Sequence, residues 1–427
     1  MTSSTLTKQH RLNAPELHHL PNGLTIVAEQ MPIDVINLNL WLNVGSYLEP
    51  DPINGMAHFL EHMIFKGTER LPSGEFERRI EQRGAVINAA TSQDYTHYYL
   101  TCAPSHFKEL APLQIDMVLN PLIPDDAFER ERLVVIEEIR RSQDNPRRRM
   151  FGHMMELGFE VSPYRRQVLG LQEVISQLQP QQMRDFHSYW YQPKSITAVV
   201  VGNLPVEELI DTVALGFGNT KGEHPKKNNK YPTKNYIETP FTEVVRRSYT
   251  DKSLQQARLA MIWRVPGLKD LSQTYALDVL AAILGHGRTS RLVRDLREDR
   301  GLVSHIGASN MTFQHQGIFY ISAQCPVENI EIVENAILQH IRTLKNELVS
   351  KSEIARISSQ VANRFVFANE SPSDRAGLYG YYLSLIGALE PAFNYPSYIQ
   401  GQNSIHLMEA AKKYLSSDTY GVVITKP

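Results

Sequence analysis

The amino-acid sequence predicts an α+β fold made of two homologous domains, each a mainly antiparallel β-sheet packed with α-helices. Three observations lead to this prediction. The chain has 427 residues, more than one hydrophobic core usually holds. Strand-like apolar runs are mixed with long helical segments in both halves. The order of these segments recurs at a spacing of about 220 residues, far longer than the period of a solenoid.

Each half begins with a strand, a turn and an apolar helix. The first strand is residues 36–44 (INLNLWLNV), and the helical run 55–67 (GMAHFLEHMIFKG) follows it. The second half offers the strand 257–265 (ARLAMIWRV) and the helical run 274–287 (TYALDVLAAILGHG). We expect Asn54 to cap the helix of the first half.

The later elements also repeat in the same order. A charged helix ends in Arg-Gly in each half, at Gly84 and at Gly301, and strands follow both. Each half then closes with a β-branched strand, residues 197–203 (TAVVVGN) and 420–426 (YGVVITK).

These repeats divide the chain into two domains and a linker. We predict an N-terminal domain over residues 1–222 and a homologous C-terminal domain over residues 241–427. Residues 223–240 are polar, basic and contain proline, which is typical of an exposed linker.

Composition limits the partners and the location of the chain. The net charge of −2 and the lack of a long apolar run give no reason to expect nucleic-acid or membrane binding. The N-terminal segment lacks the apolar core of a secretory signal. Only two cysteines, Cys102 and Cys325, are present, which argues for a reducing compartment and against a disulfide framework. We expect a bacterial-type cytoplasmic protein, in preference to one of an organellar matrix.

The chemistry is concentrated in the sequence HFLEH, which begins at His58. The surrounding helical run is apolar, so its helix should be buried, and His58, Glu61 and His62 share one face of it. Buried imidazoles and carboxylates need partners or a metal. Two histidines four residues apart can converge on one tetrahedral zinc ion.

Only the first half carries this pattern. When Gly67 is aligned with Gly287, the three polar residues fall opposite Asp278, Ala281 and Ala282. The fold therefore does not require them, and we predict that only the N-terminal domain binds zinc.

A third protein ligand is expected from the helix that begins near Pro124 and ends before Pro146. Glu131 and Glu138 are two turns apart on this helix and share a face, with Val134 and Val135 between them. Catalytic zinc commonly takes two histidines and one carboxylate. The alternative for each acid, including Glu137, is a salt bridge to an arginine of the same helix.

HFLEH, followed by Glu138 76 residues after its last histidine, resembles the inverzincin signature. The resemblance is to the family of pitrilysin, insulin-degrading enzyme and mitochondrial processing peptidase. It extends over almost the whole chain, including 84–98 (GAVINAATSQDYTHY) and 284–302 (LGHGRTSRLVRDLREDRGL). The length is similar to that of the short two-domain branch, which includes the processing peptidase beta subunit and bacterial processing proteases and whose members work as dimers.

The resemblance implies roles for individual residues. It gives one zinc ion per chain, with His58, His62 and Glu138 as ligands and Glu131 as their support, and so settles the choice against Glu137. Glu61 would be the base that activates the attacking water.

The resemblance also implies how substrate binds. Peptide would add as a strand beside Asn88 and Ala89, in a run that otherwise reads only as an edge strand. Arg297 matches an arginine that binds substrate in the family, although it could equally be a surface arginine. The tyrosine expected seven residues later is Ser304 here.

We therefore expect a zinc endopeptidase that hydrolyses unfolded peptides or N-terminal extensions in an enclosed cleft. It would be the metal-bearing subunit of a dimer. The partner would be a homologous subunit with the Arg and Tyr but without HxxEH, or a second copy of this chain. The alternative is a non-catalytic structural or assembly subunit that retains the peptidase fold.

Overall fold

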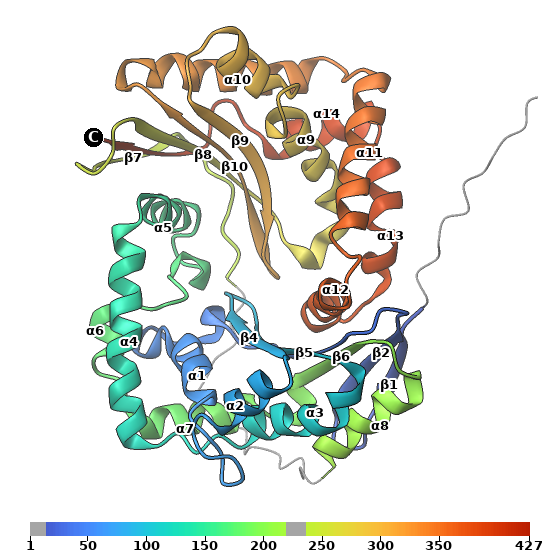
Figure 1. Ribbon diagram of the computed structural model, residues 1–427. Coiled ribbons are helices and arrows are strands. Elements are labelled where there is room, and N and C mark those ends of the chain that lie inside the picture. The colour runs from blue at the N-terminus through green and yellow to red at the C-terminus, as the bar shows by residue number, and fades with distance from the viewer. Residues whose placement is uncertain (1–13, 219–235) are drawn as a thin grey trace, which may run out of the picture.

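Two β-sheets, one in each half of the chain, organise the computed structural model (Figure 1). The structure describes residues 14–218 and 236–427. Helices pack on both sheets, so the predicted α+β class with two similar halves is confirmed.

The first sheet has six strands in the order β1-β2-β6-β3-β5-β4, and only β2 and β6 are parallel neighbours. Its strands are β1 (Glu16–His19), β2 (Thr25–Gln30), β3 (Ile36–Leu42), β4 (Val86–Thr91), β5 (Thr96–Cys102) and β6 (Ile196–Gly202). The helices of this half are α1 (Met56–Ile64), α2 (Glu75–Gln82), α3 (Pro104–Leu119), α4 (Asp125–Asp144), α5 (Pro146–Gly158), α6 (Gln172–Ile175), α7 (Pro180–Trp190) and α8 (Val206–Phe217).

The second sheet has five strands in the order β7-β11-β8-β10-β9, with β7 and β11 parallel. Its strands are β7 (Val245–Thr250), β8 (Ala257–Pro266), β9 (His305–Thr312), β10 (Gln316–Cys325) and β11 (Gly421–Lys426). The helices are α9 (Tyr275–Gly285), the π-helical segment η6 (Val293–Asp299), α10 (Ile330–Asn346), α11 (Lys351–Phe367), α12 (Pro372–Ile386), α13 (Glu390–Gln400) and α14 (Ser404–Tyr414).

The central strand β3 shows why the first sheet is covered on both faces. All seven of its residues are buried. Leu38 and Leu40 face the main core of the first half, whereas Trp41 faces a separate cluster on the opposite side. The polar residue Asn37 also lies on that opposite side, where its side-chain amide donates to Thr101 Oγ1 (2.9 Å). A strand buried on both faces must satisfy its polar side chains internally.

The two halves exchange helices to cover these second faces. Helix α12, which belongs to the second half by sequence, packs on β3 and β6 of the first sheet. Helix α5, from the first half, packs on β8 and β11 of the second sheet. Figure 1 shows both helices between the sheets. The halves therefore share two hydrophobic clusters and cannot separate without exposing them.

Buried hydrogen bonds join each exchanged helix to the sheet of the other half. The Glu29 carboxylate of β2 accepts from Arg375 Nη1 and from Tyr379 OH of α12, both at 2.7 Å. In the second half, Arg264 Nε of β8 donates to the backbone oxygen of Gly158 at the end of α5 (2.7 Å). These hydrogen bonds fix the position of each helix against the sheet of the other half.

The predicted domain boundaries stay a prediction. Residues 223–235 of the predicted linker lie outside the described residues. Cys102 and Cys325 lie at the ends of β5 and β10, and both are buried and free.

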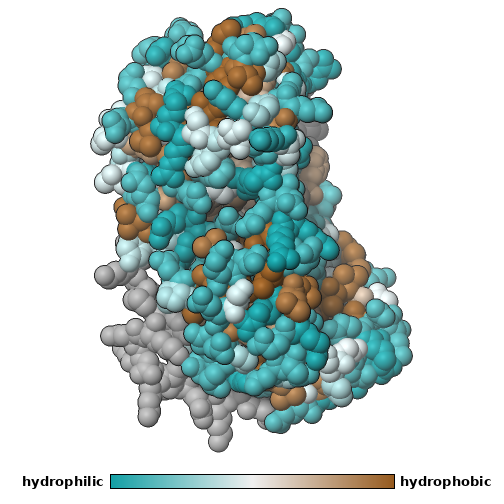
Figure 2. All heavy atoms as spheres, turned by 90° about the vertical axis from the view of Figure 1, so that its left-hand side faces the viewer, coloured by the Kyte–Doolittle hydropathy of each residue, from teal (hydrophilic) through white to brown (hydrophobic). Residues whose placement is uncertain are grey.

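A helix that crosses a bilayer needs both sufficient length and an apolar composition. Within residues 14–218 and 236–427, none of the helices combines the length and the apolar composition needed to cross a bilayer. Figure 2 views the molecule from the side of α4 and α5. That face is mostly hydrophilic, and its hydrophobic residues lie in separate groups.

Gly380→Ala tests the exchange of α12. A Cβ atom at this position would overlap the indole ring of Trp41. We therefore expect the substitution to lower the free energy of unfolding by about 1–3 kcal/mol, as overpacking in cores does. Gly377→Ala, in the same helix, is the matched control. Nothing lies within 4 Å of its Cβ position, so it should leave stability unchanged or raise it by up to about 1 kcal/mol. Equal effects in urea denaturation would contradict this packing.

Candidate metal centre

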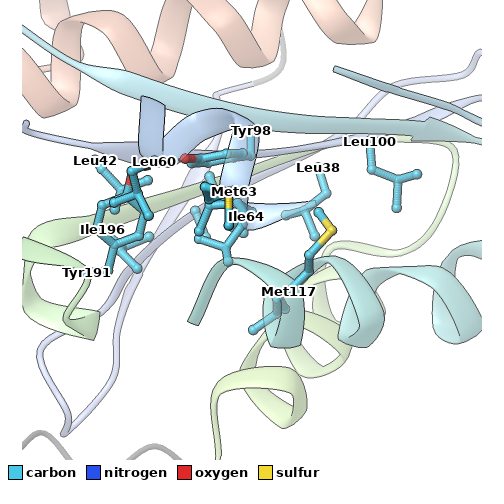
Figure 3. Close-up of a cluster of buried hydrophobic side chains, with 14 of the residues drawn as sticks. Leu38, Leu42, Leu60, Met63, Ile64, Tyr98, Leu100, Met117, Tyr191 and Ile196 are labelled. Carbon is cyan, nitrogen blue, oxygen red and sulfur yellow. Dashed lines mark hydrogen bonds between the residues drawn. The ribbon is translucent and has the colours of Figure 1, made fainter. Parts of the chain in front are cut away.

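The apolar side of α1 anchors this helix in the core of the first half. Seven of its nine residues are buried. In Figure 3, Leu60, Met63 and Ile64 lie among side chains of the sheet and of neighbouring helices, including Leu38 and Met117. This packing fixes the rotation of α1 and therefore the direction of its polar stripe.

The N-terminus of α1 is held by Glu49, not by Asn54 as the sequence predicted. The N-cap residue is Gly55, at φ 97°, which has no side-chain acceptor to cap the helix. Instead the Glu49 carboxylate, 2% exposed, accepts from the backbone N–H groups of Gly55 (2.8 Å) and Ala57 (2.7 Å). Asn54 donates its side-chain amide to the same carboxylate (2.8 Å). A buried acid at a helix N-terminus satisfies free donors and complements the helix dipole.

The polar stripe of α1 meets the last third of α4. His58 Nε2 and His62 Nε2 each lie 3.5 Å from Glu138 Oε2. One ligand atom from each of these three residues lies within 4.8 Å of the others. In the described part of the chain, this is the one such cluster of three His, Cys, Asp or Glu residues. The structure therefore brings together the three residues predicted as ligands.

The geometry of this cluster fits a zinc ion. Tetrahedral zinc holds its ligands at about 2.0–2.1 Å, which places them roughly 3.4 Å from one another. The two separations of 3.5 Å are close to that spacing and lie at the outer limit of a hydrogen bond. Two imidazole nitrogens and one carboxylate oxygen form a common donor set of catalytic zinc, with a fourth position left for water or substrate.

Glu131 supports His62 from the side away from Glu138. Its Oε1 lies 2.9 Å from His62 Nδ1, and its Oε2 forms an ion pair with Lys66 Nζ (2.6 Å). A carboxylate at Nδ1 holds the proton on that nitrogen and leaves Nε2 free to bind a metal. By contrast, His58 Nδ1 is buried and has no hydrogen-bond partner among the described residues, so packing orients this ring.

The third candidate acid of α4, Glu137, forms salt bridges on its own helix, which is the alternative that the sequence left open. Glu137 faces solvent and pairs with Arg141 (3.3 Å) and Arg140 (4.0 Å) on its own helix. The prediction that Val134 lies on the buried stripe was wrong. Val135 is fully buried, but Val134 is 51% exposed, because α4 turns only one narrow face towards the core.

Glu61 lies between the cluster and the edge strand β4. Its Oε2 accepts a hydrogen bond from Thr91 Oγ1 (2.5 Å). No salt bridge joins it to another described residue. Glu61 is therefore next to the ligand atoms but is not one of them.

Burial and the hydrogen bonds within the cluster together determine its protonation behaviour. Burial lowers the pKa of His58 to about 4, so this ring is neutral, the form that binds a metal. Burial also raises the pKa of Glu61, against the hydrogen bond from Thr91. For His62, burial lowers the pKa, but hydrogen bonds to Glu138 and Glu131 outweigh it and raise the pKa overall. The hydrogen bond from His62 lowers the pKa of Glu138.

The predicted substrate strand is β4, at the open edge of the first sheet. Among the strands of residues 14–218 and 236–427 it pairs with β5 alone, and Asn88 and Ala89 lie near its middle. The backbone N–H of Ala89 donates to the side-chain oxygen of Asn88 (2.9 Å), so an added peptide would compete for this donor. Since Thr91 of the same strand bonds to Glu61, a peptide along β4 would run close to the polar stripe.

The predicted Arg297 is not part of this cluster. It lies in η6 of the second half, where it pairs with Glu298 (2.6 Å). Ser304, at the position of the expected tyrosine, donates to Gln256 Oε1 (2.5 Å). The structure does not join either residue to the ligand atoms.

The sequence interpretation missed three residues that shape the centre. Thr91 lies in the predicted edge strand, and its position at the strand end was the available signal. Lys66 lies four residues after His62, a spacing that brings residues to one side of a helix. Glu49 lies in a loop, and nothing in the local pattern identifies it.

Two family models match most of the chain. Residues 25–171 match the model described as "Insulinase (Peptidase family M16)". Residues 177–361 match the model described as "Peptidase M16 inactive domain". The chain belongs to the pitrilysin/insulinase family. Its form is the short, two-domain one.

Relatives of this family align over nearly the full length of the chain. A protein from Helicobacter pylori named "Zinc protease PqqE" is 28% identical, covering 96% of this chain and 92% of its own. An "Uncharacterized zinc protease" from Rickettsia felis is 26% identical, covering 95% and 96%. The crystal structure of a protease from Helicobacter pylori superposes with a TM-score of 0.90 at 27% identity, covering 97% of this chain and all of that one.

A peptidase M16 inactive domain from Pseudomonas fluorescens has a TM-score of 0.85 at 18% identity, over 97% of this chain and 98% of that one. At this identity the likeness concerns the fold alone.

Glu49→Gln tests how the metal-bearing helix is fixed. The substitution replaces one acceptor oxygen by a donor that faces backbone N–H groups. We expect the free energy of unfolding to fall by about 1–3 kcal/mol. Glu69→Gln, an exposed acid shortly after α1, should change it by less than about 0.5 kcal/mol. Equal thermal midpoints for both variants would show that Glu49 does not hold the helix.

Proposed function

We propose that the chain is a zinc-dependent endopeptidase that hydrolyses unfolded peptides or N-terminal extensions. The observation that carries this proposal is the convergence of His58 Nε2, His62 Nε2 and Glu138 Oε2, with an unligated Glu61 beside them. Polar groups removed from water are costly unless they are satisfied, and a bound metal ion would satisfy these three. The arrangement therefore favours a metal-binding role over a purely structural one. The zinc-protease names of the relatives support the choice of metal.

The residues around the cluster have distinct roles in this proposal. A zinc ion at this site would polarise the scissile carbonyl and lower the pKa of a coordinated water. Glu61 takes a proton from the attacking water and gives it to the leaving amine. Thr91 orients the Glu61 carboxylate, and Glu131 with Lys66 keeps the Nδ1 proton on His62.

The form of the substrate follows from the open edge of β4. Strand addition requires an extended peptide, because the backbone donors and acceptors of a folded segment are already used. Asn88 and Ala89 would offer the nearest backbone groups, two to three residues before Thr91. Folded proteins should therefore be poor substrates.

We also propose a cytoplasmic location. The two cysteines are free and buried, as is usual in a reducing compartment. The crystal structure of the periplasmic protease PqqL from Escherichia coli has a similar fold at 20% sequence identity. At that identity the likeness concerns the fold and not the location of this chain.

Substitutions at the cluster test the metal assignment. Zinc should bind at one ion per chain and be lost in His58→Ala, His62→Ala and Glu138→Gln. Glu61→Gln should keep the zinc and lose turnover of an unstructured peptide, since Glu61 supplies a base and not a ligand. Glu137→Gln, one residue from the ligand, is the matched control and should keep both. Metal content by mass spectrometry and a fluorogenic peptide assay measure these outcomes.

Stoichiometric zinc in a folded His62→Ala protein would rule out this ligand set. Retained turnover in Glu61→Gln would contradict the assignment of Glu61 as the base, but it would not contradict the zinc ligands.

Two observations favour a second role, as one subunit of a pair that is inactive on its own. Ser304 stands where the family resemblance leads us to expect a tyrosine, and its hydroxyl is engaged by Gln256. Arg297 is held by Glu298. We propose that the Arg and Tyr that act on the substrate come from a homologous subunit that lacks HxxEH.

Reconstitution tests the partner. Losing one donor to the oxyanion typically slows an enzyme by about 10²–10³. Mixing the chain with such a subunit should therefore raise kcat/KM by about that factor, and a Tyr→Phe change in the subunit should abolish the gain. An isolated chain that already cleaves peptide at about 10 per second would show that no partner is needed.

A further inference from the structure

The second half carries a carboxylate at the position that corresponds to the first zinc ligand. Asp278 lies on α9, the counterpart of α1, and aligns with His58 when Gly67 is set against Gly287. Ala281 and Ala282 occupy the positions of Glu61 and His62 and are 2% exposed. This half therefore lacks the metal ligands and has one acid on the corresponding face of the helix.

Asp278 is not paired with a cation. Its Oδ1 accepts from Asn310 Nδ2 (2.8 Å) and its Oδ2 accepts from Tyr395 OH (3.0 Å). No salt bridge joins it to another described residue, and no nearby cation lowers its pKa. Burial raises that pKa to about 6, so the group is mainly ionised at neutral pH. A charge in such surroundings is costly unless a counter-charge is present.

A second acceptor beside Asp278 is also unsatisfied. Asn310 uses its amide nitrogen on Asp278, and its Oδ1 is buried without a hydrogen-bond partner in the described part of the chain. Acceptors therefore outnumber donors at this point. A ligand that brings N–H donors and a positive charge would supply the counter-charge that Asp278 lacks.

The carboxylate faces a pocket with aromatic walls. The pocket has a volume of about 460 Å³, and Phe365, Tyr381, Tyr382 and Tyr395 line it together with Asp278. Phe365 and Tyr395 stack with their ring centroids 4.7 Å apart. Aromatic faces around a carboxylate attract ammonium and guanidinium groups. The volume is sufficient for a lysine or arginine side chain.

One cation lines the same pocket, at a different point. Arg364 of α11 is exposed and contacts His286 Nδ1 (3.4 Å). It does not pair with Asp278. Its charge would repel a cationic ligand and attract an anionic one. Removing this charge should therefore strengthen the binding of a cation and weaken the binding of an anion.

We propose that this pocket binds a lysine or arginine side chain of the peptide substrate. The ammonium or guanidinium group would bind Asp278, and its aliphatic chain would pack on Phe365 and Tyr395. The pocket borders Ser309, Asn310 and Thr312 of β9, the outermost strand of the second sheet, so a side chain can reach it from that edge. The proposal rests on the proposed function in one respect, that the ligand is a peptide.

Equilibrium binding to the Glu61→Gln chain tests this without turnover. Fluorescein-labelled, N-acetylated peptides of about fifteen residues, which span up to roughly 50 Å when extended, carry one lysine or norleucine at each position in turn. At a few neighbouring positions of the peptide, lysine should lower Kd about tenfold or more relative to norleucine, as charge-assisted hydrogen bonds do. Asp278→Asn, which keeps an acceptor for Tyr395, should abolish the difference. Arg364→Gln should keep it or increase it.

The controls separate this inference from the proposed function. Asp299→Asn changes an exposed acid of the same half and should have no effect on Kd. Equal Kd values for lysine and norleucine at every position, with tight binding of both, would overturn the pocket assignment alone. A lysine preference that survives Asp278→Asn would do the same.

A lysine-free peptide with an unacetylated N-terminus distinguishes the source of the charge. If it binds as tightly as the lysine peptides and depends on Asp278, the pocket takes the terminal amine and the side-chain assignment is wrong. If no peptide binds at all, the proposed function and this inference both fail. The thermal midpoint of Asp278→Asn checks that this variant is folded.

Discussion

The placement of three polar side chains on α1, of which His58 is buried and Glu61 and His62 are half-buried, is the constraint on which the first half depends. His58, Glu61 and His62 share one stripe of a helix that is otherwise packed in the core. Each neighbouring element supplies part of what that stripe needs. Helix α4 brings Glu131 and Glu138, two turns apart, to the imidazoles, and β4 brings Thr91 to Glu61. A loop acid, Glu49, holds the start of the helix. One metal ion would complete this set.

The exchange of helices makes the position of this centre a property of the whole chain. Because α12 covers the first sheet and α5 covers the second, the two halves share their hydrophobic cores. Their common fold then allows different chemistry at corresponding positions. The first half uses the inner face of α1 for histidines, whereas the second uses the same face of α9 for Asp278. A gene duplication that kept the packing and changed a few positions of that face would give this result.

The sequence was sufficient for the fold class and for bringing the ligand residues to one helix face, because both depend on periodicity. The alternation in β3 and the spacing of His58 and His62 are local patterns. The choice of Glu138 as the third ligand needed more than periodicity. Glu131, Glu137 and Glu138 are all possible ligands until the rotation of α4 is known. Contacts between distant segments left no local signal. The support of α1 by Glu49 and the covering of β3 by α12 depend on loops that periodicity does not describe. The error at Val134 has the same origin, because only packing shows how narrow the buried face of α4 is.

X-ray absorption at the zinc edge of the metal-loaded protein tests the central claim most directly. The account predicts one site whose first coordination sphere contains only nitrogen and oxygen donors at about 2.0–2.1 Å. It also predicts the multiple-scattering signal of two imidazole rings, which should fall to one ring in His58→Ala if weak binding survives. Sulfur scattering at about 2.3 Å, or the absence of imidazole scattering, would show that zinc binds elsewhere and that the polar stripe of α1 is not a metal centre.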